Sequence, residues 1–310
     1  MRKSLILPLL FAIALPAAAQ NHRALITDVS GTVTIARSNG TQANASWGMQ
    51  LFDGDQVVTG ADSKAALLYS DGSLVSLAAN DRADVGESSS SAPTVDPTML
   101  ADVSDLTLQR TGVGELAALG GLRAGASAAV IDLTSPRQTR IRDGVPTFTW
   151  SAEAGFELFT VTVLSDAGEI WSGSTEANLL AYPSNAPTLE PGVTYFWRVE
   201  GEEMLDVTRS ELVQFEVMAA DDVESLKNAE SSIREALSSP DSETSRDFLL
   251  GSLYARHGMN AEALDVFSRI AEGQGESAML LEILGKLYYE TGRKDLAVES
   301  LQRALELSRQ

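Results

Sequence analysis

The stretch GSLYARHGMNAEALDVF (251–267) returns 34 residues later as GKLYYETGRKDLAVESL (285–301). The two copies share small residues and a tyrosine at matching positions, and each ends on a large apolar residue. The matched pairs are Gly251 and Gly285, Tyr254 and Tyr288, Gly258 and Gly292, Ala263 and Ala297, and Phe267 and Leu301. Small residues let two helices cross closely, while the larger side chains fill the space between them. A period of this length predicts a helix–turn–helix unit that occurs twice.

The repeat resembles the tetratricopeptide repeat, and the resemblance covers residues 221–310. One period further back, Ala229 and Ile233 fall on DVESLKNAESSIREAL, which predicts a single helix before Pro240 and the two full repeats. In tetratricopeptide proteins the first helix of each repeat lines a concave surface that binds partners. With repeats starting at Thr244 and Ala278, the resemblance implies a partner-binding surface made of Phe248, Ser252, Arg256, Met279, Glu282, Lys286 and Tyr289. The alternative is that these side chains pack against the neighbouring sandwich or a second copy of the chain.

Residues 24–86 alternate short apolar or β-branched runs with turn pairs, which predicts a compact β meander. The turn pairs are Asn39-Gly40, Asp53-Gly54 and Asp71-Gly72. The stretch LLYSDGSLVSL (67–77) predicts a hairpin with a two-residue type I′ loop at Asp71 and Gly72, because that loop needs residues that tolerate positive φ angles.

The same segment contains a Gly-x-Val strand at 31–33, an A-x-x-G-x-x-L-x-x-G-D-x-V-x-T-G block at 45–60 and an A-x-L-x-x-x-D-G-S-x-V-x-L hairpin at 65–77. This set of motifs resembles the FecR domain. The resemblance implies a periplasmic β module, best known from regulators that relay a receptor's signal to a cytoplasmic sigma factor. Those regulators have a membrane-crossing helix where this chain has an expected signal peptide, so the resemblance supports the fold and the compartment rather than signalling across the envelope.

Residues 135–218 carry further strand signals with many aromatic side chains, which predicts a β-sandwich. The run LEPGVTY (189–195) resembles the tyrosine corner of fibronectin type III domains, which implies that the Tyr195 hydroxyl ties the turn before its strand. Trp150 is the expected core tryptophan. We interpret the aromatic side chains as core, with a sugar-stacking platform as the alternative. Residues 87–134 are predicted to be a Ser/Gly-rich linker with a short helix.

The first nineteen residues, MRKSLILPLLFAIALPAAA, have basic residues before a short apolar run and small residues at its end. This layout predicts a secretory signal peptide (1–19) that is cleaved before Gln20. No other stretch is long and apolar enough to span a membrane. The formal charge of −20 gives an acidic surface that repels phosphate backbones and anionic lipid. We therefore expect an exported, soluble periplasmic protein that binds no nucleic acid.

The chain has no cysteine and only two histidines, His22 and His257. Zinc sites of the usual Cys or His type and thiol nucleophiles are therefore excluded. The sequence also has no Gly-x-Ser-x-Gly elbow. We expect no catalytic residue and no cofactor, so the chain is not expected to be an enzyme.

The acidic loop that starts at Asp53 is a candidate cation site, but it fails as an EF-hand. Val57, Val58 and Lys64 stand where that loop requires an oxygen ligand, a glycine and a bidentate glutamate. We interpret the carboxylates as turn residues and expect no metal. A looser calcium site made by Asp53, Asp55 and Asp62 is the alternative.

The sequence thus predicts a multidomain chain with an all-β FecR-like module and a β-sandwich, followed by an all-α tetratricopeptide repeat array. The expected function is a non-catalytic periplasmic scaffold or adaptor that binds an envelope protein or peptide through its helical repeats. One alternative is a soluble sensor or regulator that acts through the FecR-like module. The others are a peptidoglycan- or glycan-binding protein and self-association into a homo-oligomer.

Overall fold

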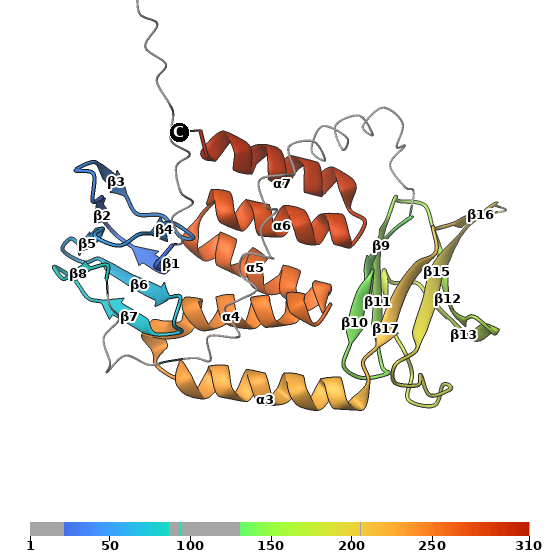
Figure 1. The fold of residues 1–310 in the computed structure, drawn as a ribbon. Coiled ribbons are helices and arrows are strands. Elements are labelled where there is room, and N and C mark those ends of the chain that lie inside the picture. Colours follow the sequence, from blue (N-terminus) through green and yellow to red (C-terminus); the bar gives the residue numbers. More distant parts are fainter. Residues whose placement is uncertain (1–21, 87–93, 95–130, 205, 310) are drawn as a thin grey trace, which may run out of the picture.

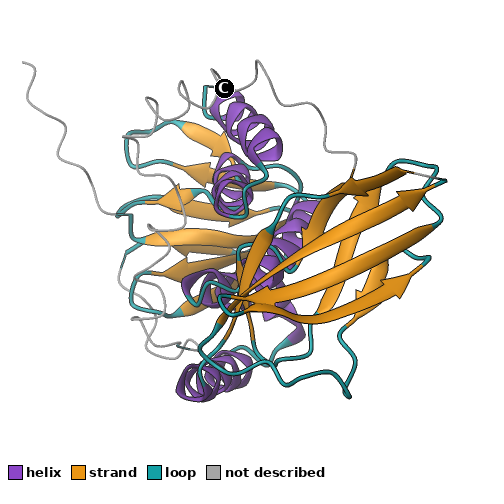
Figure 2. Cartoon of the chain, turned by 90° about the vertical axis from the view of Figure 1, so that its right-hand side faces the viewer, coloured by secondary structure: helices purple, strands orange, loops and turns teal. Residues whose placement is uncertain are grey.

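The computed structural model describes residues 22–86, 94, 131–204 and 206–309. The expected signal peptide, and the helix expected within 87–134, lie outside these residues. The described chain has three parts: two β parts, and a layer of helices between them (Figure 1). Figure 2, viewed from the side of the second β part, shows the helices nearly end-on. The β-then-α order predicted from the sequence is confirmed.

The first β part, the N-terminal module, is residues 22–86. Its strands are β1 (Ala24–Ser30), β2 (Val33–Ala36), β3 (Gln42–Asn44), β4 (Gln50–Leu51), β5 (Gln56–Thr59), β6 (Lys64–Tyr69), β7 (Leu74–Leu77) and β8 (Arg82–Asp84). They form two four-stranded sheets, in the orders β4-β1-β6-β7 and β3-β2-β5-β8. An apolar core that includes Ile26, Ile35, Leu51 and Leu67 fills the space between the sheets.

The β6–β7 hairpin is present, but the predicted type I′ loop is wrong. Gly72 adopts φ +89° while Asp71 does not have a positive φ, although a type I′ turn requires both. Instead the Gly72 amide donates to the Tyr69 carbonyl at 3.0 Å, and the Tyr69 amide donates to the Ser73 carbonyl at 2.9 Å. The Asp71 carboxylate accepts from the Ser73 amide at 3.0 Å. This side-chain bond favours a longer turn that ends on a left-handed glycine.

The second β part, the sandwich, spans residues 131–217. Its strands are β9 (Ile131–Ser135), β10 (Thr139–Ile141), β11 (Thr147–Ala152), β12 (Leu158–Ser165), β13 (Gly168–Thr175), β14 (Leu179–Ala181), β15 (Thr194–Glu203), β16 (Asp206–Arg209) and β17 (Val213–Val217). One sheet has the order β14-β11-β9, and the other has the order β10-β17-β15-β12-β13 with β16 beside β15. Among the described residues, β9 pairs with β11 and lies in the stretch just before residue 135, where the sandwich was predicted to start.

The sandwich is fibronectin type III-like in its tyrosine corner and its aromatic core. The Tyr195 hydroxyl accepts a hydrogen bond from the Glu190 amide at 2.7 Å, as the LEPGVTY motif implied. Tyr195, Trp197 and Val199 alternate inward along β15 and are at most 3% exposed. Trp150 is 4% exposed on β11. These side chains are core residues, so they cannot form the sugar-stacking platform considered as an alternative.

The helices follow β17 directly. They are α3 (Ala220–Ala236), α4 (Glu243–Arg256), α5 (Asn260–Gln274), α6 (Ala278–Glu290) and α7 (Lys294–Leu307), with a short 3-10 turn at Pro240–Ser242. The matched residues of the 34-residue repeat occupy matched places. Gly258 and Gly292 have φ angles of +72° and +76° in the turns after α4 and α6, and Ala263 and Ala297 are fully buried. A Cβ atom on Gly285 would lie 2.6 Å from Leu301, so this glycine sets how closely α6 and α7 pack.

The helices and the N-terminal module share one hydrophobic core. Leu25, Ala66 and Leu68 belong to the same buried cluster as the inward side chains of α3 to α6. Their neighbours along β1 and β6, such as Ile26 and Leu67, face the module's own core instead. The sheet β4-β1-β6-β7 is therefore buried on both faces. This explains why β6, and the first three residues of β1, form continuous apolar runs rather than alternating with polar residues.

Candidate interaction surface

The seven side chains predicted to bind a partner fall into two groups. Phe248 and Met279 lie in the first halves of α4 and α6, near the N-terminal module, and Ser252 lies one helical turn after Phe248. Phe248 is fully buried, with its ring centroid 5.4 Å from that of Trp47 in an edge-to-face arrangement. Ser252 is 2% exposed and donates to the Phe248 carbonyl at 2.8 Å.

The N-terminal module covers this half of the helical face through a loop. Trp47 is 1% exposed and donates from its indole nitrogen to the Thr27 carbonyl at 3.0 Å. A Cβ atom on the next residue, Gly48, would lie 2.9 Å from Met279, so only glycine allows this close approach. Phe248 was predicted to lie on the partner-binding surface, but its side chain is buried and is not accessible to a partner. It belongs to a joint core made by two parts of the chain.

Of the remaining four residues, Arg256, Lys286 and Tyr289 lie towards the other ends of α4 and α6, and Glu282 lies in the first half of α6. Arg256 is exposed in the last turn of α4, and Tyr289 is 52% exposed in the last turn of α6. Glu282 and Lys286 are half-buried on the same helix as Tyr289. The Lys286 ammonium is 3.9 Å from the Glu290 carboxylate. The structure thus leaves one half of the predicted surface accessible, at the ends of α4 and α6 that face the sandwich (Figure 1).

A network of polar side chains connects the N-terminal module to the helices through hydrogen bonds beside the joint core. The Thr27 and Ser245 hydroxyl oxygens are 2.7 Å apart and fully buried. The Gln274 side chain, at the end of α5, donates to the Asp28 carboxylate at 3.0 Å and accepts from the Val29 amide at 3.0 Å. Asp28 also accepts from the Lys64 ammonium at 2.9 Å, and this bond raises the pKa of Lys64.

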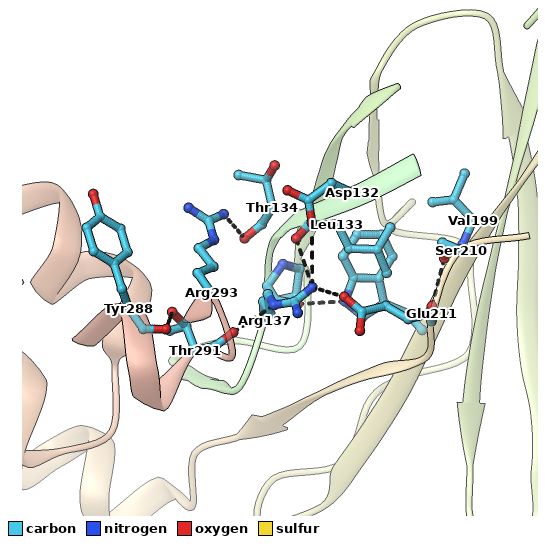
Figure 3. Close-up of polar contacts among 12 residues, drawn as sticks. Asp132, Leu133, Thr134, Arg137, Val199, Ser210, Glu211, Tyr288, Thr291 and Arg293 are labelled. Carbon is cyan, nitrogen blue, oxygen red and sulfur yellow. Dashed lines mark hydrogen bonds and ion pairs between the residues drawn. The ribbon is translucent and has the colours of Figure 1, made fainter. Parts of the chain in front are cut away.

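The sandwich meets the other end of the helices through three arginines of the segment that leads into and out of β10. We call this interface, made by residues 134–142 against α3 and the turns at 257–261 and 291–293, the arginine seam. Arg137 donates to the Thr291 carbonyl at 2.7 Å in the turn before α7 and pairs with Glu211 of the sandwich (Figure 3). Arg293, beside that turn, donates back to the Thr134 carbonyl at 3.0 Å.

Arg140 makes the equivalent contact one repeat earlier. It donates to the carbonyl of His257, which lies 34 residues before Thr291, at 3.3 Å. Its guanidinium also bonds the Asp222 carboxylate of α3 at 2.5 Å and the Glu216 carboxylate of β17 at 3.1 Å. Two arginines three residues apart therefore contact the same carbonyl of two successive repeat turns.

Arg142 completes the seam at α3. Its guanidinium makes a bidentate ion pair with the Glu230 carboxylate. This carboxylate also accepts a hydrogen bond from the Tyr254 hydroxyl at 2.7 Å. Burial opposes the charge of Glu230, but the bonds from Arg142 and Tyr254 outweigh it and hold the pKa of Glu230 below its usual value. None of the three seam arginines was singled out by sequence reasoning. The signal available was the basic run RQTRIR (137–142) in an acidic chain.

The acidic turns of the N-terminal module are structural. Asp55 is 2% exposed and accepts hydrogen bonds from the Arg37 guanidinium at 2.6 Å and from the Phe52 and Ser38 amides at 3.0 and 3.2 Å. Asp53 lies 3.2 Å from Arg23. Within the described ranges, no group of three or more acidic, histidine or cysteine side chains is placed to hold a metal ion.

The part of the chain that the structure describes also contains no helix that is both long and apolar enough to cross a membrane.

No protein-family model matches the sequence, and no curated protein matches it. Solved structures match parts of the chain. A cell surface anchoring domain is 26% identical over 21% of this chain and 86% of its own, with a TM-score of 0.20. The fn3 domain of human collagen alpha-1(XX) chain is 13% identical over 31% of this chain and 94% of its own, with a TM-score of 0.24.

A β-1,2-glucanase from Parabacteroides distasonis is 10% identical over 93% of this chain and 49% of its own, with a TM-score of 0.23. Matches with scores this low carry no argument about function. The description of the sandwich rests on its own tyrosine corner and core. The resemblances to FecR domains and tetratricopeptide repeats rest on the motifs quoted above and remain predictions.

Proposed function

We propose that the chain is a non-catalytic interaction scaffold of the bacterial cell envelope. In this proposal the helices are a tetratricopeptide-like pair of repeats, and the N-terminal module is FecR-like. The partner is an envelope protein or peptide that binds the accessible half of the helical face, between the two β parts. The proposal includes export to the periplasm, which rests on the expected signal peptide at 1–19.

The observation that supports this proposal most is the placement of Tyr289 and Arg256. Both lie in the last turn of the first helix of their repeat, and Tyr289 keeps 52% of its surface exposed although Phe248, on the same face, is fully buried. Tyrosine and arginine are enriched among the residues that contribute most to protein–protein binding. An aromatic side chain left exposed beside a well-packed core therefore favours a partner surface over a purely structural one.

Site-specific photo-crosslinking in a Gram-negative host tests this function. A photoreactive phenylalanine analogue replaces Tyr289 in one strain and Leu305 in a second strain. Leu305 is a matched control because it is 39% exposed on α7, in the second helix of the same repeat. We expect a discrete adduct from position 289 and none from position 305. Equal labelling at both positions, or no adduct at position 289, would contradict a partner site on this face.

A further inference from the structure

The two β parts attach to the helices in physically different ways. The N-terminal module shares a buried apolar cluster with α3 to α6, in which Leu68, Trp47 and Phe248 are all members. The cluster that fills the sandwich contains only residues between 131 and 217. No buried apolar cluster of the described residues therefore bridges the arginine seam. The sandwich has a complete core of its own, and its attachment to the helices is polar.

The ion pairs of Arg137 and Arg140 remain within reach of solvent, whereas Glu230, the partner of Arg142, is only 12% exposed. Arg140 is 24% exposed and its partners Asp222 and Glu216 are 46% and 36% exposed. Pairs in such positions are screened by salt, whereas an apolar core is not weakened by ionic strength. Arg137 is 9% exposed, but its partner Glu211 is 49% exposed.

The seam also leaves polar groups unsatisfied. Asn260 Oδ1, Glu262 Oε2 and Arg293 Nε are buried atoms without a hydrogen-bond partner in the described chain, and all three lie on the helix side of the seam. Burying a polar atom without a partner is unfavourable. Separation of the sandwich from the helices would return these atoms to water, which offsets part of the cost of breaking the arginine contacts.

A pivot for such a separation exists where β17 runs directly into α3. Met218 is 1% exposed and packs with the helices, and its amide donates to the Ile141 carbonyl at 2.9 Å. Ala219, the residue before α3, has an extended backbone and makes no side-chain cap. The two parts are therefore joined by a short connection on one side of the seam. Rotation about this connection opens the seam without unfolding either core.

We propose that the sandwich is a hinged module that docks reversibly on the helices through the arginine seam, while the N-terminal module is permanently fused to them. Raised ionic strength opens the hinge because it weakens the seam and leaves the joint apolar core intact. Because Tyr289 lies two residues before Thr291, the carbonyl that Arg137 binds, opening the seam also widens access to the helical face. The motion itself does not depend on the proposed partner.

Distance measurements between paired spin labels test the hinge. The chain has no cysteine, so introduced cysteines are labelled uniquely. Ser174→Cys with Glu299→Cys reports the sandwich–helix distance, and Thr41→Cys with Glu299→Cys reports the module–helix distance, all three positions being exposed. From low salt to about 1 M salt, where the Debye length falls to about 3 Å, we expect the first distribution to broaden towards longer distances. We expect the second distribution to stay unchanged.

Substitutions in the seam separate this hinge from a general effect of salt. Arg140→Ala combined with Arg142→Ala should produce the broadened sandwich–helix distribution at low salt. The control Arg209→Ala removes an exposed arginine that pairs with Glu200 inside the sandwich, and it should leave both distributions unchanged. Narrow, identical distributions in every condition would overturn the hinge. Equal broadening of both pairs would overturn the contrast between a fused and a docked module.

Discussion

Phe248 connects two parts of the chain that lie two hundred residues apart. Its ring lies 5.4 Å from Trp47 and 6.2 Å from Phe267, measured between ring centroids. Removing such a fully buried ring costs about 3–5 kcal/mol. We therefore expect Phe248→Ala to lower the melting temperature by many degrees, and Tyr289→Ala to leave it nearly unchanged. An unaltered melting temperature for Phe248→Ala would show that the joint core does not form in solution.

Glu262 makes the folding stability depend on pH with the opposite sign to an ordinary salt-bridged carboxylate. Burial raises the pKa of Glu262. A carboxyl whose pKa is higher in the folded than in the unfolded state favours folding while protonated, and the advantage is lost as the pH rises through the folded pKa. We expect Glu262→Gln to stabilise the protein at neutral pH. The gain should shrink as the pH falls towards the ordinary glutamate pKa of about 4.3.

Thermal unfolding at a series of pH values measures this effect. The matched control is Glu272→Gln, because Glu272 is exposed on the same helix. A gain for Glu262→Gln that is equal at all pH values, or that is matched by Glu272→Gln, would contradict the role of burial.

At the level of single residues, the sequence predicted local bonding better than the location of surfaces. The Tyr195 corner is formed within one short motif, so the motif was sufficient to predict it. The role of Phe248 depends on Trp47, which comes from a distant loop, and no periodicity within the helices reveals that loop. The available signal was Trp47 in ASWGMQL (45–51). A tryptophan in a turn exposes a large apolar surface unless another part of the chain packs against it.

The α6–α7 hairpin depends on a glycine that is unfavourable for an isolated helix. Gly285 lies within α6, where alanine would favour the helix by about 0.5–1 kcal/mol. A Cβ atom at this position would meet Leu301 at 2.6 Å, however, so the two helices would have to move apart. We expect Gly285→Ala to destabilise the protein by about 1–3 kcal/mol. Adding Leu301→Ala should bring less further loss than Leu301→Ala causes in the wild-type background.

A double-mutant cycle of chemical unfolding measures this coupling, since residues in contact give non-additive changes. Strictly additive losses would show that the close crossing of α6 and α7 is not what requires glycine. At the scale of elements, the repeat predicted these helices correctly. Its small residues were expected where helices cross, but Gly258 and Gly292 lie in the turns with positive φ angles. The type I′ loop was wrong because the Asp71 side chain bonds its own turn, which a dipeptide rule does not consider.

At the scale of the whole molecule, the sequence indicated the parts but not how they are joined. The apolar runs of β1 and β6 do not alternate, which is typical of strands buried on both faces, but only a compact β meander was predicted here. The second covering layer begins at Ala220, far from both strands in sequence, so pattern alone could not identify it. The roles of the arginines in and beside β10 could not be predicted either. A basic residue on a strand is usually solvated, and the carbonyl partners of Arg137 and Arg140 carry no side-chain signal.

The central claim is that the N-terminal module and the helices form one cooperative unit, with the sandwich as a second. Hydrogen exchange followed by mass spectrometry across a urea series tests it most directly. We expect amides of β1, β6, α4 and α5 to lose protection at a common urea concentration. Leu68→Ala, which lowers the free energy of unfolding by about 2–5 kcal/mol, should lower that concentration for all four elements. Amides of β12 and β15 should keep their wild-type midpoint in that variant, and Val161→Ala in the sandwich core should lower theirs alone. Separate midpoints for β1 and β6 on one side and α4 and α5 on the other would contradict the shared core.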